Sequence, residues 1–194
     1  MIIHISGPSG SGKSVIGRKI QKHYGKSIVM KDLDELRDEF INKHYNIDKP
    51  YSFEESKYQK YIKSYINKHK SKPIVFVGLN DNNFGKTKSL YYDLSADYKF
   101  YINIDNSIII QQKCERFITE FLPEILKEHR NDITEKNKIF VKNVIRNFRE
   151  ECGAKLTIRD NNKWARNYKQ MKYQFMSREM IYKLVISLIN KHFK

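Results

Sequence analysis

A glycine-rich segment near the start of the chain constrains the fold more than any other feature. The run Gly7-Pro8-Ser9-Gly10-Ser11-Gly12-Lys13-Ser14 fits the pattern G-x-x-x-x-G-K-[ST] at every fixed position. The short apolar run 2–6 before it predicts a strand. Residues 13–24 after it predict a helix, because Val15, Ile16 and Ile20 recur at helical spacing and Gly25 follows. A strand, a glycine loop and a helix N-terminus in this order surround an anion with backbone N–H groups, so the segment predicts a phosphate-binding loop.

The two residues that close the pattern supply the remaining chemistry. Lys13 is expected to reach the β- and γ-phosphates of a nucleoside triphosphate, and the Ser14 hydroxyl is expected to bind Mg²⁺ that the phosphates also chelate. We therefore expect ATP and Mg²⁺ as cofactors, with GTP left open. The predicted binding set is Gly7, Pro8, Ser9, Gly10, Ser11, Gly12, Lys13, Ser14 and Val15.

The rest of the chain alternates between strand and helix patterns, which predicts an α/β fold. We expect a parallel sheet of about five strands, helices on both of its faces and a helical lid. The whole chain, 1–194, is expected to form one domain, with 107–153 as a lid-bearing insertion. Expected strands are 2–6, 27–30, 72–81, 99–105 and 173–176; expected helices are 13–24, 32–45, one beginning at Ser52, 106–126, 132–153 and 177–193, while 154–172 is left open.

Several side-chain patterns refine these helices. The stripe Tyr58, Ile62, Tyr65 and His69 is interpreted as core packing rather than as a base-stacking surface. Pro123 is expected to bend or end its helix. Asp132 and Glu135 resemble a capping box, and Gly153 is a stop signal. The last helix is expected to turn inward Met180, Ile181, Leu184, Val185, Leu188 and Ile189.

The amino-acid composition limits where in the cell the protein is expected and which partners it is expected to bind. A net charge of +15 raises the question of nucleic acid, but the basic residues are spread along the chain and a nucleotide-binding protein needs positive potential anyway. Nucleic acid is therefore an open but not a favoured partner. Cys114 and Cys152 form neither a disulfide framework nor a zinc spacing, which indicates the cytoplasm. The sequence shows neither a signal peptide nor a membrane span, and a monomer and a homodimer both remain open.

The segment after the second strand carries acidic residues where α/β sheets bind ligands. Its residues Asp34-Glu35-Leu36-Arg37 resemble the D-x-L-R of adenylate kinases, and Asp32 with Asp34 is similar to the D-x-D of shikimate kinase. Together with the phosphate loop, the chain resembles the small P-loop kinases: adenylate and other nucleoside monophosphate kinases, shikimate kinase and chloramphenicol phosphotransferase.

That resemblance implies roles for three of these side chains. Asp34 would hold a magnesium-bound water or the acceptor, so Ser14 and Asp34 form the expected metal set. Asp32 would be the alternative base, and the choice between the two carboxylates stays open. Arg37 would anchor the acceptor, which tilts the prediction toward an acceptor that already bears phosphate. A structural reading also exists, since acidic residues at a helix start are favoured by the helix dipole.

Other parts of the chain depart from the family pattern. The third strand ends in Val77-Gly78-Leu79-Asn80-Asp81 where adenylate kinases have a D-G-F-P-R-like stretch, so AMP is not predicted. Asp81 is a candidate acceptor contact from the loop, and turn chemistry explains the Asn80-Asp81 pair equally well. Before the lid, Gln112 replaces the first arginine of R-x-x-x-R and Arg116 matches the second. The resemblance implies that Arg116 neutralises the transferring phosphoryl group. Arg130, Arg146 and Arg149, in or beyond the next helix, are either further lid cations or solvated surface residues, and Trp164 is left unassigned.

We expect an ATP-dependent phosphotransferase whose acceptor is a small molecule, a nucleotide or nucleoside first. The alternative is a polynucleotide 5′-hydroxyl kinase or another nucleic-acid-end-processing enzyme, for which the charge and the 13 tyrosines would form a binding track. A switch or motor NTPase is disfavoured because the sequence has neither an hhhhD[DE] strand end nor an NKxD stretch.

Overall fold

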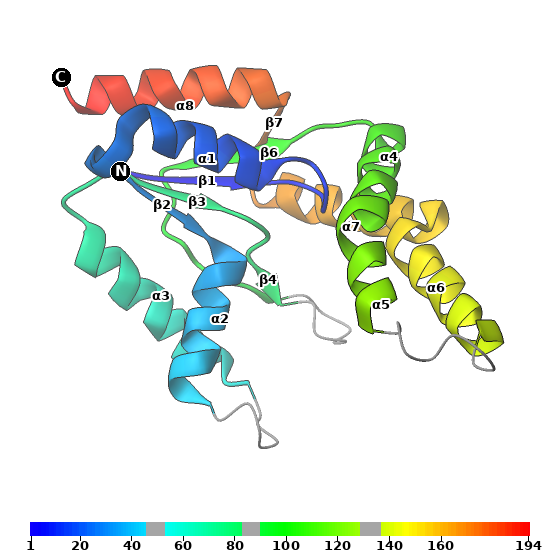
Figure 1. Ribbon diagram of the computed structural model, residues 1–194. Coiled ribbons are helices and arrows are strands. Elements are labelled where there is room, and N and C mark those ends of the chain that lie inside the picture. The colour runs from blue at the N-terminus through cyan, green and yellow to red at the C-terminus, as the bar shows by residue number, and fades with distance from the viewer. Residues whose placement is uncertain (46–52, 83–89, 129–136) are drawn as a thin grey trace. The chain divides into compact units, whose positions relative to one another are not determined.

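The structure is a computed structural model that describes residues 1–45, 53–82, 90–128 and 137–194. The chain divides into two compact units (Figure 1). The first comprises Met1–Gly7, Gly12–Asn103 and Tyr168–Lys194, and the second comprises Pro8–Ser11 and Ile104–Asn167. Each unit is described by itself below.

A five-stranded parallel sheet is the centre of the first unit (Figure 1). Its spatial order is β2-β3-β1-β6-β7, and β1 pairs with β3 from Ile2↔Ile74 and with β6 from Ile3↔Tyr98. The predicted α/β class with a parallel sheet is confirmed. The strands are β1 (Ile2–Ser6), β2 (Val29–Asp32), β3 (Ile74–Val77), β6 (Tyr98–Ile102) and β7 (Gln174–Met176); β4 (Asp81–Asn82) and β5 (Leu90–Tyr91) form a separate antiparallel pair.

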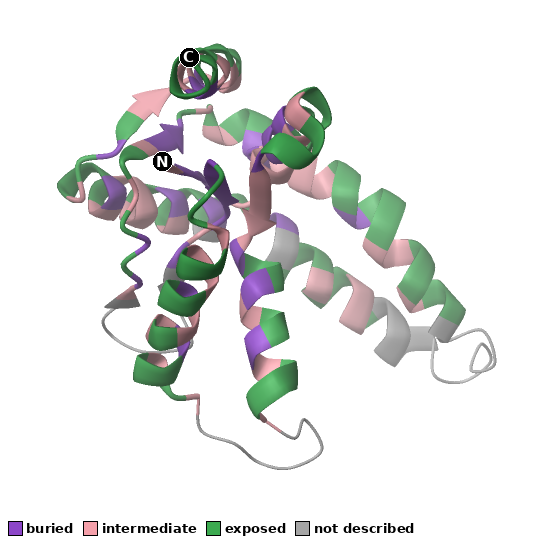
Figure 2. Cartoon of the chain, turned by 90° about the vertical axis from the view of Figure 1, so that its left-hand side faces the viewer, coloured by how far each residue is buried: buried purple, intermediate pink, exposed green. Residues whose placement is uncertain are grey.

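Two helices cover one face of this sheet (Figure 1). They are α1 (Lys13–Tyr24) and α8 (Arg178–His192), which pack against each other. Helix α1 approaches the sheet closely at Gly17, where an added Cβ would lie 2.9 Å from Val77 Cγ1. Beneath them β3 and most of β1 are buried, whereas β2 is half-buried; Figure 2 gives the burial of the described residues by colour. Glycine in mid-helix is therefore explained by packing, since no larger side chain fits there.

The opposite face of β2 and β3 packs against two further helices, α2 (Leu33–His44) and α3 (Glu55–His69). Phe40 and Tyr58 are both almost fully buried there, with ring centroids 5.2 Å apart. Tyr58 and Ile62 belong to this core and Tyr65 packs against it, so core packing is confirmed for these three residues of the α3 stripe. His69 lies outside the cluster, beside Tyr65. The full cluster is Leu33, Leu36, Phe40, Tyr58, Ile62, Ile74, Phe76, Tyr92 and Leu94.

The second unit is helical. It contains α4 (Asn106–Arg116), a π-helical turn (Phe117–Phe121), α5 (Leu122–Glu128), α6 (Asn137–Cys152) and most of α7 (Ala154–Gln170). Pro123 lacks an N–H for the carbonyl four residues earlier, and the preceding turn widens so that Leu122 N–H donates to Phe117 O. The helix thus continues past the proline instead of ending. Gly153 separates α6 from α7, in the stretch that the sequence left open.

Several expectations about individual residues need correction or lie outside the described ranges. The second strand extends to Asp32 rather than ending at residue 30, because its partner β3 pairs with it up to Val77. Met180 is 58% exposed, since only Ile181, Val185 and Ile189 of α8 are buried against the sheet. Val15, one of the three apolar residues noted at helical spacing in α1, is 45% exposed, whereas Ile16 and Ile20 are buried. Outside the described ranges lie Ser52 and the proposed capping box of Asp132 and Glu135.

Candidate functional site

The phosphate loop leaves β1, the central strand, at the carboxyl edge of the sheet. The connection after β1 runs toward β2 and the one after β6 runs toward β7, so the strand order reverses between these neighbours, at the kind of switch point where α/β sheets bind ligands. Gly10 and Gly12 both have φ of +82°, a left-handed conformation that side chains disfavour. Gly12 is also the N-cap residue of α1. The sequence pattern is therefore realised as a strand, a glycine turn and a helix N-terminus, which is a P-loop arrangement.

Lys13 folds back over its own loop. Its Nζ donates a hydrogen bond of 2.9 Å to the carbonyl of Gly7, the residue that follows β1. Within the second unit, Ser11 N–H donates to Pro8 O at 3.1 Å, and Gly10 lies against Ile109 and Lys113 of α4. Lys13 thus joins the two ends of the loop that belong to the first unit.

Ser14 and Asp32 meet beside the loop. The Ser14 hydroxyl donates to Asp32 Oδ2 at 2.8 Å, while Asp32 Oδ1 accepts the Asp34 N–H at 3.0 Å and so caps α2. Asp32 is thus also the N-cap of α2, because its two carboxylate oxygens have different partners. An added Cβ on Gly78 would lie 3.4 Å from Asp32 Oδ1, so a side chain is disfavoured after β3 as well.

Asp34 points to a different partner. Its Oδ1 accepts a 2.6 Å hydrogen bond from Arg37 Nη2 on the next turn of α2, and its side chain is 65% exposed. We expected Ser14 and Asp34 as the metal set, whereas the carboxylate that lies beside Ser14 is that of Asp32. The reason is the two-residue extension of β2, which places Asp32 at the strand end and Asp34 already inside the helix.

Arg37 reaches inward from α2, with a side chain only 23% exposed. It lines a small cavity between α2, α3 and the segment after β3, together with Asn80 and the apolar residues Leu33, Tyr58, Ile62, Leu79, Tyr92 and Leu94. Asp81 lies in β4, paired with Tyr91. The structure therefore brings Arg37 to a cavity beside the strand ends, while for Asp81 it defines the backbone position alone.

His4 is a buried histidine on β1 that sequence reasoning missed. Its Nε2 donates to Gly78 O at 3.0 Å, because a carbonyl can only accept, and its Nδ1 then accepts from the Tyr173 hydroxyl. The pKa of His4 is lowered to about 4, chiefly by burial; the Gly78 hydrogen bond opposes this shift, and the nearby charges of Lys13 and Lys99 add to it. A neutral ring therefore fastens the start of the phosphate loop's strand to β3 and to Tyr173.

Asn80 and Tyr168 form a second buried polar pair. The Tyr168 hydroxyl donates to Asn80 Oδ1 at 2.8 Å and accepts from Asn80 N at 3.1 Å. The Asn80 amide also donates to Tyr92 O at 2.9 Å. These bonds hold the segment after β3 in place. Turn chemistry explained Asn80 in the sequence equally well, so no local signal could have found this pairing across 88 residues.

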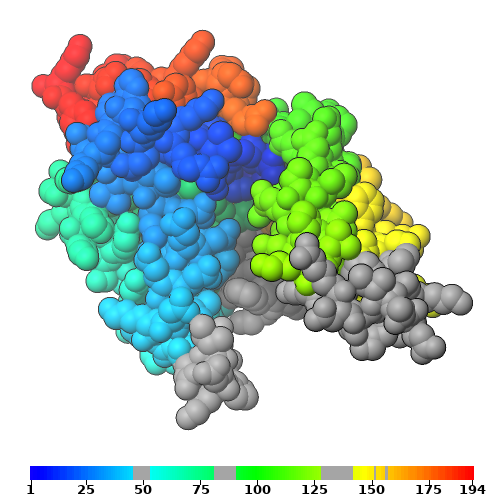
Figure 3. All heavy atoms as spheres, in the orientation of Figure 1, coloured from blue at the N-terminus to red at the C-terminus, as the bar shows by residue number. Residues whose placement is uncertain are grey.

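Arg178 is the missed residue nearest to the loop. It is the first residue of α8, and its Nη1 lies 3.1 Å from the position that a Cβ on Gly12 would occupy. In Figure 3 the start of α8 (orange) lies against the first turns of α1 (dark blue). The signal was available: Arg178 follows a short parallel strand, whose carboxyl end must lie at the same edge as the loop after β1.

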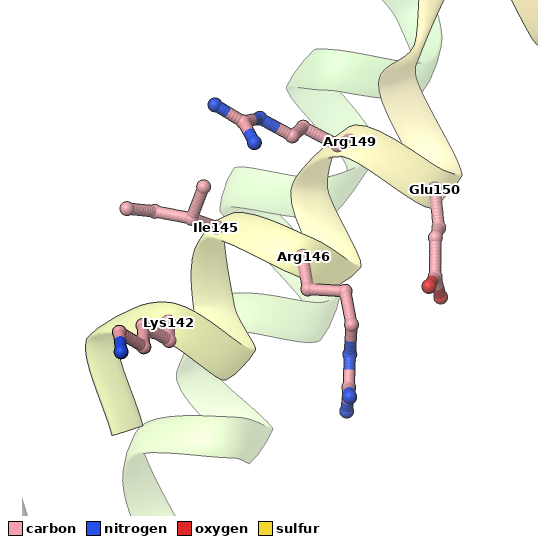
Figure 4. Close-up of a pocket in the computed structure, with 5 residues that line it drawn as sticks. All are labelled: Lys142, Ile145, Arg146, Arg149 and Glu150. Atoms are coloured by element: carbon pink, nitrogen blue, oxygen red, sulfur yellow. The ribbon is translucent and has the colours of Figure 1, made fainter. Parts of the chain in front are cut away.

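The cations proposed for the lid lie in the second unit. Arg116, at the end of α4, donates from Nε to Glu120 Oε2 at 2.7 Å and lies over the ring of Phe121. Gln112 Oε1 is buried and has no hydrogen-bond partner among the described residues. Arg146 and Arg149 line a pocket of about 510 Å³ along α6 with Lys142, Ile145 and Glu150 (Figure 4). Arg130 lies outside the described ranges.

The residues beside the loop fit a magnesium–phosphate ligand. Ser14 and Asp32 offer the hard oxygen ligands that Mg²⁺ prefers, and phosphate oxygens would complete its shell. The hydroxyls of Ser6 and Ser11 are fully buried without a hydrogen-bond partner among the described residues. Buried hydroxyls rarely stay unpaired, so both indicate a polar ligand or water. In the described ranges no cluster of three or more His, Cys, Asp or Glu could hold a metal by itself.

Comparisons with known proteins do not identify a family. No family model and no curated protein sequence match the chain. Among solved structures, an uncharacterised protein from Eubacterium ventriosum is similar at 13% identity and a TM-score of 0.47, over 98% of both chains. A tRNA delta(2)-isopentenylpyrophosphate transferase from Staphylococcus epidermidis is similar at 12% identity and a TM-score of 0.49, over 98% of this chain and 99% of the other. The fold is therefore defined by the chain's own strand order and phosphate loop.

Within the described residues, every helix is too short or too polar to cross a membrane.

Proposed function

We propose that the chain is an ATP-dependent phosphotransferase that moves the γ-phosphoryl group to a small acceptor, a nucleotide or nucleoside. The observation that carries the proposal is the hydrogen bond between Ser14 and Asp32, which joins the phosphate loop to an acidic strand end. A loop that only binds phosphate needs no carboxylate next to its serine. An enzyme that hydrolyses or transfers the γ-phosphoryl group does, because Mg²⁺ must be held against the phosphates, and a transferase must position its acceptor there as well.

The chain's own residues have separable roles in this reaction. Lys13 would exchange its bond to Gly7 O for the β- and γ-phosphate oxygens and hold them in place. Ser14 and Asp32 would hold Mg²⁺, which when bound neutralises phosphate charge. Asp32 would also orient the acceptor oxygen in line for transfer. GTP remains open beside ATP, because nothing at the loop reads the base.

Arg37 is the proposed acceptor anchor. Its guanidinium is mostly buried at a cavity beside the strand ends, and Asp34 holds it from the outer side at 2.6 Å. A positioned guanidinium favours a carboxylate or phosphate on the acceptor. The cavity is small, so an acceptor of nucleotide size needs it to widen. Asp34 then acts by orienting Arg37 rather than by binding metal, and Asp81 remains a proposed contact from the neighbouring segment.

A cover over the reacting phosphates is the remaining part of the proposal. Transfer to an acceptor competes with hydrolysis, so water must be excluded while the phosphates are held. The helical unit, with Arg116 and the α6 cations Arg146 and Arg149, is the proposed lid, and Arg116 would leave Glu120 to neutralise the transferring group.

One observation favours a second candidate, a kinase acting on the 5′-hydroxyl end of a nucleic acid. The pocket along α6 is lined by three cations, Lys142, Arg146 and Arg149, against a single acid, Glu150. Exposed cations in a row on one helix suit a phosphate backbone. That candidate shares the phosphate loop with the first and differs only in the acceptor.

An acceptor panel tests both candidates. ADP release from Mg-ATP is followed with nucleoside monophosphates, nucleosides, small hydroxyl compounds and a 5′-hydroxyl oligonucleotide, with Lys13→Ala as the blank. Stimulation by a small acceptor supports the first candidate, and stimulation by the oligonucleotide alone supports the second. If only Lys13-dependent hydrolysis appears with every acceptor, phosphotransfer is the wrong reaction.

A further inference from the structure

Arg178 stands at a place where a cation is unfavourable unless an anion is present. It is the first residue of α8, directly after the N-cap Ser177, and its guanidinium lies against Gly12, the N-cap of α1. Both helix N-termini carry partial positive charge, and Lys13 adds a full one next to Gly12. In the empty site, a cation in this position is repelled by these positive charges, which raises the free energy of the protein. When phosphates are bound, the same cation attracts them and lowers the free energy of the complex.

The charged groups around Arg178 do not cancel this arrangement. Glu179 is exposed beside it; its pKa is lowered first by its backbone hydrogen bond, then by Ser177 and by the charges of Arg178 and Lys19. No ion pair between Arg178 and an acidic residue occurs within the described ranges. Arg178 is only partly exposed, so its position is set by the surrounding chain rather than by solvent. The guanidinium is thus held at the loop without a carboxylate to explain it.

We propose that Arg178 is a phosphate-binding residue, the second cation of the loop, which contacts the ligand's phosphate chain from the α8 side while Lys13 contacts it from within the loop. This rests on the proposed function only in that the loop binds phosphates. The guanidinium supplies several N–H donors in one plane, so it can bond two phosphate oxygens at once. Unlike a lid residue, it belongs to the same compact unit as Gly12 and Lys13 and is in place before any closure.

Inorganic tripolyphosphate with Mg²⁺ is the probe, because it has no base or ribose. Its equilibrium dissociation constant is measured by calorimetry for wild type, Arg178→Ala, Arg178→Lys and Lys183→Ala, an exposed cation on the same helix. We expect Arg178→Ala to bind about 10- to 100-fold more weakly, the range for one hydrogen bond to a charged group. Arg178→Lys should recover part of the loss, and Lys183→Ala should match wild type. Thermal melting of each variant confirms that it is folded.

The same titrations with ATP separate the outcomes. Equal losses for tripolyphosphate and ATP support phosphate binding. A loss for ATP alone would mean that Arg178 contacts the nucleoside, which overturns the proposal, as would unchanged binding of both ligands. If wild type binds tripolyphosphate through Arg178 but no acceptor is ever phosphorylated, the proposed function fails while the role of Arg178 stands. If wild type binds neither ligand, both are wrong.

Discussion

The Ser14 hydroxyl donates a 2.8 Å hydrogen bond to Asp32 Oδ2, which ties the first turn of α1 to the end of β2. This contact distinguishes Asp32 from Asp34, between which the sequence could not choose. Asp32 lies at the loop, and Asp34 faces Arg37. The consequences can be measured with substitutions that change charge but not shape.

Asp32→Asn is expected to weaken the apparent affinity for Mg²⁺ in ATP turnover by about 10- to 100-fold, the usual loss when a group in or next to a metal's ligand set is changed. Asparagine still caps α2, because its side-chain oxygen accepts the Asp34 N–H equally well. Asp34→Asn is the matched control and should leave Mg²⁺ affinity nearly unchanged. If Asp34→Asn instead weakened the Mg²⁺ affinity more than Asp32→Asn, Asp34 would be the metal ligand.

Buried His4 makes stability depend on pH. The unfolded chain protonates His4 near pH 6.5, whereas the folded chain protonates it only near pH 4. The unfolded state therefore binds more protons between these values, and the free energy of unfolding falls as pH drops through that window. The loss from pH 7 to pH 5 should be about 2 kcal/mol.

Urea unfolding at both pH values measures this loss. His4→Gln should be less stable at pH 7 and should no longer lose about 2 kcal/mol of unfolding free energy between pH 7 and pH 5. His192→Gln, at the exposed end of α8, should keep it. An unchanged slope in His4→Gln would show that another group is responsible.

Tyr168→Phe removes one hydroxyl and leaves the ring in place. Asn80 then loses the partner of its side-chain oxygen and of its backbone N–H in a buried site. The expected cost is about 1 to 3 kcal/mol of unfolding free energy, measured by urea denaturation. Tyr98→Phe, at an exposed position on β6, should cost much less. Equal effects in the two variants would contradict a structural role for the Asn80–Tyr168 pair.

Gly17→Ala has two effects on stability that act in opposite directions. Alanine favours a helix over glycine by about 1 kcal/mol, but its Cβ would lie 2.9 Å from Val77 Cγ1 and 3.3 Å from Met30 Sδ. Overpacking of this kind costs about 1 to 3 kcal/mol, so we expect net destabilisation. Lys22→Ala, on the exposed side of α1, is the control for an alanine without a clash and should change stability little, because lysine is itself a good helix former. A stabilised Gly17→Ala would mean that α1 can move away from the sheet.

The sequence predicted the parts of the fold that local patterns encode. The glycine loop, the helix from Lys13 to Tyr24 and the buried run of β3 each depend on residues next to one another, and the alternation of strand and helix then implied a parallel sheet. The helix α7 was left open because its segment is rich in charged and amide residues and even its buried face carries the polar residues Thr157 and Asn161.

The candidate site was harder to predict, because its contacts join distant segments. Only pairing of β2 with β3 fixes where β2 ends, and with it which aspartate meets Ser14. Arg178 and Gly12 are 166 positions apart in the numbering and meet only because β1 and β7 end at the same edge. The residue types indicated the chemistry of the site, whereas the strand order decides which residues lie together in it.

The measurement that tests the central claim most directly is the equilibrium binding of ATP in the presence of Mg²⁺ to wild type and to Lys13→Ala, with the exposed Lys19→Ala of the same helix as control. Wild type and Lys19→Ala should bind with similar affinity, and Lys13→Ala should bind at least about 10-fold more weakly, since it loses a charged hydrogen bond to the phosphates. If wild type does not bind, or if Lys13→Ala binds equally well, the glycine loop is not a nucleotide site and the proposed function is wrong.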